Sequence, residues 1–212
     1  MNIFPFEVDN EHAKQNNELL KDTKRLQISA LLFAVILLGI GFLLKTYLGG
    51  AMGIIVLSTF GIMALVSLGL IVVIPRQVGD AASLYARYEL CPAIIAKLNS
   101  RDMVLLALVN INSDPNDTPK WGLAARTVTR IEGHARHKGE KVPSVAVTGR
   151  RSVRTQDRWG EISPMPIAWG TTDPTVINAA QQAIPQNSWD LLRNNVGKLD
   201  DVLSTPYNLL EL

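Results

Sequence analysis

The architecture of this chain is decided by LQISALLFAVILLGIGFLLKTYLGGAMGIIVLSTFGIMALVSLGLIVVI, residues 26–74. This stretch contains an uncharged run of 19 residues, 26–44, and a second one of 24 residues, 51–74. A helix of 19 residues is ~28 Å long, which matches the thickness of the hydrocarbon core of a bilayer. Neither run has the polar face of a helix that packs on a soluble core. The stretch therefore predicts two transmembrane helices.

The six residues KTYLGG, 45–50, connect the two runs. Backbone in lipid must satisfy its own hydrogen bonds, so we expect this connection to be a tight turn at the membrane surface. Lys45 and Tyr47 are typical of the headgroup region, and Gly49 and Gly50 are typical of turns. Because a hairpin returns the chain to the side that it left, both termini should share one compartment.

Basic residues are concentrated at the two ends of the predicted hairpin. The connection contains Lys45, whereas six basic residues flank the hairpin: Lys14, Lys21, Lys24, Arg25, Arg76 and Arg87. Basic flanks are retained on the cytoplasmic side during insertion. We therefore expect both termini and the soluble part of the chain to be cytoplasmic.

Small residues mark one face of each predicted helix, which indicates that the two helices pack closely on each other. The helix-packing candidates are Ala30, Ala34, Gly41, Gly53, Gly61 and Ala64. The alternative is that glycine and alanine are simply common in membrane helices. Neither span contains an Asp, Glu, Lys, Arg or His. This argues against transport or proton relay and favours an anchor or a docking surface.

The remaining sequence predicts a polar N-terminal segment (1–25), a linker helix (75–90) and a soluble β-rich domain (91–212). Five short runs favour strands and are separated by turn-rich pieces. They are AIIAKLN, MVLLALVNIN, GLAARTVTRI, VPSVAVTGR and ISPMPIAWG. We expect an α+β domain built on a small five-stranded antiparallel β-barrel, SH3-like or OB-like.

Two C-terminal helices are expected to complete the domain. Asp173 and Pro174 are typical of a helix start, and that helix should end near Ala183. Ser188 is the expected N-cap of the next helix. Its apolar residues recur on one stripe, which packs on the strands or on a partner subunit; they are Trp189, Leu192, Val196, Leu199 and Leu203.

The most suggestive polar stretch is GRRSVRTQDR, residues 149–158. Residues 126–158 contain nine Lys or Arg against three acids. Next to a membrane anchor, such an excess favours contact with anionic lipid headgroups at ~1 kcal/mol per basic residue. A solvated face and an acidic protein partner are the alternatives, and nucleic acid is disfavoured because no aromatic residues are interleaved. The binding candidates are Arg150, Arg151, Arg154 and Arg158.

Residues with catalytic or metal-binding chemistry are few. His134 and His137 have a metal-ligand spacing but lack the further ligands that zinc needs, so exposed loop histidines are expected. Cys91, the single cysteine, is expected to be a buried inert thiol. No phosphate-binding glycine loop, nucleophile elbow or metalloprotease helix is present. We expect no enzymatic activity, no cofactor and no bound metal.

Four phrases, RDMVLLALVN, KWGLAARTV, EISPMPIAWGTTD and TPYNLLEL, carry a family resemblance over residues 88–212. The chain resembles a family of corynebacterial and related actinobacterial two-pass membrane proteins, catalogued as a domain of unknown function. The resemblance implies a bacterial plasma membrane and brings no established active site. By lineage and architecture it also suggests a partner, the respiratory cytochrome bcc–aa3 supercomplex.

The sequence thus predicts a non-enzymatic two-pass protein of the plasma membrane that docks as an accessory subunit on a larger integral membrane complex. The alternative is a membrane-tethered binding module that engages anionic lipid headgroups or a soluble partner through the basic segment.

Overall fold

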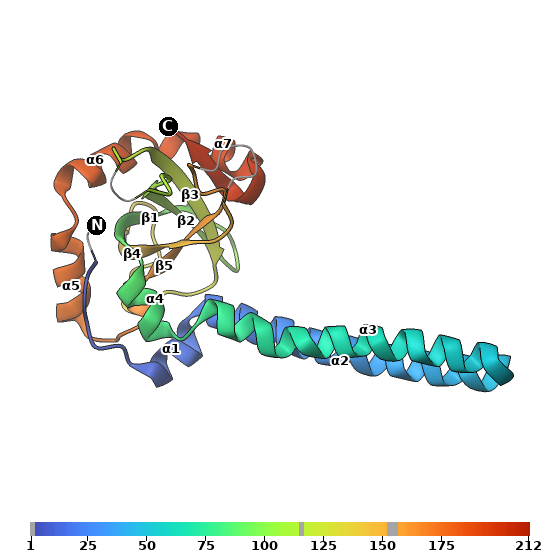
Figure 1. Ribbon diagram of the computed structural model, residues 1–212. Helices are drawn as coiled ribbons and strands as arrows, with labels where there is room; N and C mark the ends of the chain where they lie inside the picture. The colour runs from blue at the N-terminus through green and yellow to red at the C-terminus, as the bar shows by residue number, and fades with distance from the viewer. Residues whose placement is uncertain (1–2, 115–116, 152–156) are drawn as a thin grey trace. The chain divides into compact units, whose positions relative to one another are not determined.

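The structure is a computed structural model that describes residues 3–114, 117–151 and 157–212, with the side chains of 74–78 excepted. The chain forms two compact units (Figure 1). The first is a helical hairpin, residues 19–80, and the second is a domain that combines the N-terminal residues up to Glu18 with Ala81–Leu212.

The hairpin consists of α2 (Glu18–Leu48) and α3 (Gly50–Val78), which run side by side (Figure 1). Both helices are long and apolar enough to span a membrane. The connection is shorter than the sequence predicted, because Lys45–Leu48 continue α2. Gly49 and Gly50 turn the chain with φ values of 60° and 50°, a left-handed conformation that costs glycine little.

Close contact between α2 and α3 is made by small and polar residues. Ser67 Oγ donates to the carbonyl oxygen of Ala30 at 2.9 Å, and Gln27 Nε2 donates to that of Ile71 at 2.9 Å. Ala34, Leu37 and Ala64 form a buried apolar cluster. These contacts satisfy polar groups inside the hairpin, as an apolar solvent requires.

The glycines of α2 and α3 differ in how closely the neighbouring helix approaches them. A Cβ on Gly41 would lie 2.8 Å from Cβ of Phe60, and one on Gly53 would lie 2.8 Å from the carbonyl oxygen of Lys45. These glycines therefore permit the close approach. Gly61 was expected at the same contact, but a Cβ there would meet nothing within 4 Å.

The domain contains a sheet of six antiparallel strands in the order β5-β4-β1-β2-β3-β6. The strands are β1 (Leu90–Leu98), β2 (Met103–Asn110), β3 (Trp121–Val128), β4 (Lys141–Thr148), β5 (Ile162–Pro166) and β6 (Leu209–Glu211). All five predicted strands are present. The sequence did not predict β6, which has only three residues and pairs with β3 at the sheet edge.

The sheet curls into a half-barrel. Arg126 on β3 donates to Oγ of Ser163 on β5 at 2.7 Å, although β3 and β5 are not neighbours in the sheet. Residues Met103–Val109 of the central strand β2 are all buried. Such a continuous apolar run is typical of a strand that is covered on both faces. The SH3-like or OB-like type of barrel stays a prediction.

Short helices cover the sheet: α4 (Ala81–Arg87), α5 (Pro174–Ala183), α6 (Gln186–Asn194) and α7 (Leu199–Ser204), with 3-10 turns η1 (Ile167–Trp169), η2 (Val196–Lys198) and η3 (Pro206–Asn208). The Asp173 side chain caps α5 as predicted, accepting from the Thr175 amide at 2.8 Å. The prediction of a Ser188 cap was wrong, because α6 begins at Gln186. The single helix predicted beyond Ser188 is broken at Asn195, and its stripe packs on the sheet.

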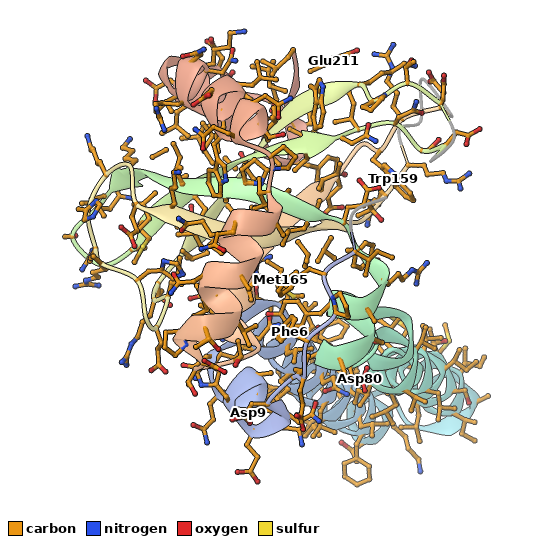
Figure 2. All side chains as sticks on the ribbon, turned by 90° about the vertical axis from the view of Figure 1, so that its left-hand side faces the viewer. Phe6, Asp9, Asp80, Trp159, Met165 and Glu211 are labelled. Atoms are coloured by element: carbon orange, nitrogen blue, oxygen red, sulfur yellow. The ribbon has the colours of Figure 1, made fainter. Side chains whose placement is uncertain are left out.

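The N-terminal segment, expected as a separate polar piece, is part of the domain in the structure. Asp9 caps α1 (Asn10–Asn16), and its own amide donates to the carbonyl oxygen of Gly170 at 2.8 Å. His12 Nε2 lies 2.9 Å from the carbonyl oxygen of Ala168. The buried Asn17 donates to the sulfur of Met165 at 3.2 Å; Figure 2 labels Met165 and Asp9. The residues that precede the hairpin are therefore fixed to the sheet.

An aromatic contact completes this attachment. The rings of Phe6 and Tyr85 meet edge to face with centroids 4.9 Å apart, and Tyr85 Oη donates to the carbonyl oxygen of Pro166 at 2.7 Å. Gly170 leaves room for both rings, since a Cβ there would lie 2.5 Å from Tyr85. Phe6 lies on the N-terminal segment that precedes α1 (Figure 2).

The hairpin contact predicts different effects of two nearby substitutions. Gly41→Leu would overpack the contact with Phe60 and destabilise it by ~1–3 kcal/mol. Gly39→Leu should have little effect, because nothing lies within 4 Å of a Cβ at Gly39. Cysteines replacing Ala34 and Ala64, in a Cys91→Ala background, report on the contact by disulfide formation. Oxidation should join them in the Gly39 variant and much less in the Gly41 variant; equal yields would contradict the described packing.

Candidate functional site

The described residues of the predicted basic segment have different surroundings in the structure. Arg158 forms ion pairs with Glu211 and with Asp157, the latter at 3.6 Å. Arg150 and Arg151 are exposed, and the Arg151 guanidinium lies 5.5 Å from the centre of the Trp159 ring. Arg154 lies outside the described residues. Of the four candidates, Arg150 and Arg151 are the ones that pair with no carboxylate in the described part of the chain.

Other basic residues of the same sequence region are engaged elsewhere. Arg130 pairs with Glu132 at 3.0 Å. Arg136 donates to the carbonyl oxygens of Asn99 and Asp102 at 2.6 and 3.2 Å and so holds the β1–β2 turn. Part of the positive charge of this region is thus engaged in separate local contacts.

The two spaced histidines meet at one carboxylate. His134 Nδ1 lies 3.2 Å from Oε1 of Glu140, and His137 Nε2 lies 2.9 Å from Oε2 of the same residue. The expectation of exposed histidines holds for His137, whereas the His134 side chain is mostly buried. Among the described residues, no group of three His, Cys, Asp or Glu is arranged to hold a metal ion.

Cys91 is buried on β1, as expected for an inert thiol. Burial raises the pKa of the Cys91 thiol well above its ordinary value, and the nearby charge of Glu89 raises it further. A thiol that stays protonated is a poor nucleophile. No chemistry is therefore supported at this residue.

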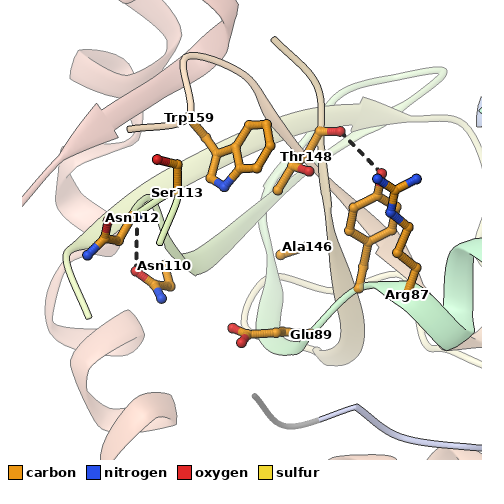
Figure 3. Close-up of a pocket in the computed structure, with 9 residues that line it drawn as sticks. Arg87, Glu89, Asn110, Asn112, Ser113, Ala146, Thr148 and Trp159 are labelled. Atoms are coloured by element: carbon orange, nitrogen blue, oxygen red, sulfur yellow. Dashed lines mark hydrogen bonds between the residues drawn. The ribbon is translucent and has the colours of Figure 1, made fainter. Parts of the chain in front are cut away.

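A polar pocket of about 170 Å³ lies where α4, the ends of β2 and β4, and Trp159 meet (Figure 3). Its described lining includes Arg87, Tyr88, Glu89, Asn110, Thr148 and Trp159. These residues come from four separate chain segments, so no sequence spacing could have identified them as a group. The sequence missed this pocket for that reason.

Hydrogen bonds to the backbone orient the polar side chains of the pocket. Asn110 Oδ1 accepts from the amides of Asn112 and Lys120, both at 3.1 Å, which fixes the side-chain plane. Tyr88 Oη donates to the carbonyl oxygen of Thr148 at 3.5 Å (Figure 3). The described lining contains one carboxylate, Glu89, and no histidine or cysteine. This arrangement can bind a small polar molecule, and it lacks the paired groups of nucleophilic catalysis.

A second cavity of about 160 Å³ shares Glu89, Asn110 and Ala146 with this pocket. The exposed Trp121 and the buried Cys91 line it. Trp121 and Trp159 therefore lie at the rim of the domain, whereas Trp169 is fully buried and donates from Nε1 to the carbonyl oxygen of Arg130 at 3.1 Å.

Comparison with known proteins places the chain in a family. Residues 76–200 match the family described as "Protein of unknown function (DUF3239)". The chain belongs to this family. A crystal structure from Corynebacterium diphtheriae, of a protein provisionally described as a membrane protein, is similar at 52% sequence identity and a TM-score of 0.57. The match covers 58% of this chain and 100% of that one.

No curated protein matches the chain. The family match and the Corynebacterium relative confirm the predicted resemblance to a corynebacterial family of unknown function. Together with the two long apolar helices, they support a membrane protein.

The buried thiol predicts a loss of stability at alkaline pH. The folded-state pKa of Cys91 lies above the ordinary thiol value of 9.0, so its contribution to stability is complete below that pH and is lost as the pH rises above it. One pH unit above the unfolded pKa, the wild type should lose about 1.4 kcal/mol relative to Cys91→Ala. Chemical denaturation of both proteins at neutral and alkaline pH measures this difference. A constant difference across the range would show that the thiol ionises equally in both states.

Proposed function

We propose that this protein is a non-enzymatic accessory subunit of the bacterial plasma membrane, whose hairpin docks laterally on a larger integral membrane complex. One observation carries the proposal. Both ends of the hairpin continue into the same compact unit, while the exposed side chains of residues 26–44 and 51–73 are mostly apolar. The exposed side chains include Leu31, Leu32, Phe33, Phe42, Ile54 and Leu65.

The hydrogen bonds of the polar side chains in the two spans support a role as a membrane anchor rather than as a transport pathway. Gln27 and Ser67 are used between the two helices. Ser58 and Thr59 donate to the carbonyl oxygens of Ile54 and Ile55 on their own helix. The residues 26–44 and 51–73 contain no ionisable side chain that a proton or ion pathway would need. What the hairpin offers to its surroundings is apolar surface.

The distribution of basic residues supports a cytoplasmic domain. Six Lys or Arg residues flank the hairpin, whereas Lys45 is the basic residue near the turn. Flanks rich in basic residues are retained inside the cell. The residues before α2 and those after α3 belong to one folded domain. This supports the placement of both flanks on the same side of the membrane.

Cysteine labelling tests this orientation. In a Cys91→Ala background, Tyr47→Cys at the hairpin turn should react with a membrane-impermeant maleimide in intact cells. Ser100→Cys, in the exposed β1–β2 turn, should react only after permeabilisation. The matched pair controls for thiol reactivity, since both positions are exposed. Labelling of Ser100→Cys in intact cells would reverse the proposed orientation.

Photo-crosslinking tests lateral docking. A photoreactive phenylalanine analogue at Leu38, which is 45% exposed, should cross-link to a neighbouring membrane protein. The same substitution at Leu37, which is 5% exposed and faces α3, should react only within the hairpin. Mass spectrometry identifies the partner, and the respiratory cytochrome bcc–aa3 supercomplex is the first complex to examine. No protein adduct at Leu38 would count against an accessory subunit.

The alternative function is a membrane-tethered binding module. It is favoured by Arg150 and Arg151, which are exposed and pair with no carboxylate in the described part of the domain. Flotation of the protein with anionic and neutral liposomes would distinguish it from docking on a protein complex, because headgroup binding is salt-sensitive.

A further inference from the structure

A cavity of about 350 Å³ lies between β1, the turn at residues 138–141 and α6, away from the predicted basic segment. It is larger than the two cavities around Asn110. All of its lining residues belong to the described part of the chain. The lining combines an apolar base with three cationic side chains, Lys138, Lys141 and Arg193.

The apolar base is held in place by the fold. Ile94, Ile95 and Trp189 are buried beneath the opening. The turn is fixed to β1 by two backbone hydrogen bonds, from Gly139 N to the carbonyl oxygen of Ile95 at 2.9 Å and from Ile95 N to that of Glu140 at 3.1 Å. The cavity is therefore preformed, as ligand sites usually are.

The three cations are not neutralised by the lining. Lys141 Nζ lies 5.0 Å from the centre of the Trp189 ring, a cation–π contact that keeps the ammonium over the base. Among the described residues, no carboxylate lies within ion-pair distance of Lys138 or Lys141. The nearby Glu140 is instead held by His134 and His137.

Arg193 is the third cation. Its guanidinium lies 3.7 Å from Oδ1 of Asp190, and its side chain is 63% exposed. Asp190 Oδ1 also accepts from Nε2 of Gln186 at 2.9 Å, and Asp190 itself does not line the cavity. No Asp or Glu is among the residues that line the cavity. An anion in the opening would therefore meet positive charge from both the turn and α6.

We propose that this cavity binds a phosphomonoester joined to an apolar carbon group. Three cations fit a phosphate, which carries close to two negative charges and offers three acceptor oxygens, better than they fit a singly charged carboxylate. The apolar base would hold the first carbon atoms. The cavity of about 350 Å³ is much larger than the ~10–15 Å³ that one water needs by the same measure, so it leaves room for a carbon group beside the phosphate. The proposal does not depend on a partner complex and holds for either proposed function.

Titration calorimetry on the full-length protein in neutral-lipid nanodiscs tests this site with hexyl phosphate as the probe. Hexyl phosphate should bind at least about tenfold more tightly than inorganic phosphate, because the carbon chain adds apolar burial. The Lys141→Gln/Arg193→Gln double variant should weaken binding about tenfold or more. The Arg150→Gln/Arg151→Gln variant is the matched control and should bind as the wild type does. Thermal unfolding of both variants verifies that they are folded.

Competition identifies the source of the phosphate. If nanodiscs containing phosphatidic acid displace hexyl phosphate, the natural ligand is a lipid headgroup; if they do not, it is a soluble phosphate ester. Either result supports the site. Absence of hexyl phosphate binding to the wild type would overturn the proposal. So would equal affinity for inorganic phosphate, or a loss caused by the Arg150/Arg151 variant instead of the Lys141/Arg193 variant.

Discussion

The attachment of the N-terminal segment to the sheet is the constraint on which the rest of the architecture depends. His12, Asn17 and Glu18 each contact the domain through polar atoms, and Glu18 accepts from the Thr129 amide at 2.7 Å. Because the buried polar groups of His12 and Asn17 would be costly to leave unpaired, their contacts hold the segment in one place. The chain on both sides of the hairpin thereby belongs to one folded unit.

The hairpin and the domain use polar groups in opposite ways. In the hairpin, Gln27 and Ser67 bond backbone carbonyls of the other helix, which leaves an apolar exterior. In the domain, polar side chains collect around cavities such as the one beside Asn110 and the cationic one beside Trp189. The difference follows from the surroundings of each part, since lipid offers no hydrogen bonds whereas water competes for every exposed group.

Charge illustrates how sequence proximity and spatial proximity diverge. The run from Arg126 to Arg158 is strongly basic as a sequence. In the fold, Arg158 pairs with Glu211, 53 positions away, and Lys141 and Arg193, 52 positions apart, line one cavity. The net charge of a segment therefore says little about the potential at any site, because ion pairs with distant residues remove part of it.

The sequence by itself determined the hairpin, the five longer strands and the Asp173 cap. Each depends on local information: an uncharged span, a short β-favouring run between turn-rich pieces, or a capping side chain next to proline. Only the tertiary structure decided the sixth strand, the place of residues 3–18, the break at Asn195 and the three described cavities. These features arise from contacts between residues far apart in the chain. The propensities of a three-residue strand or a polar segment are too weak to predict them until a partner surface is present.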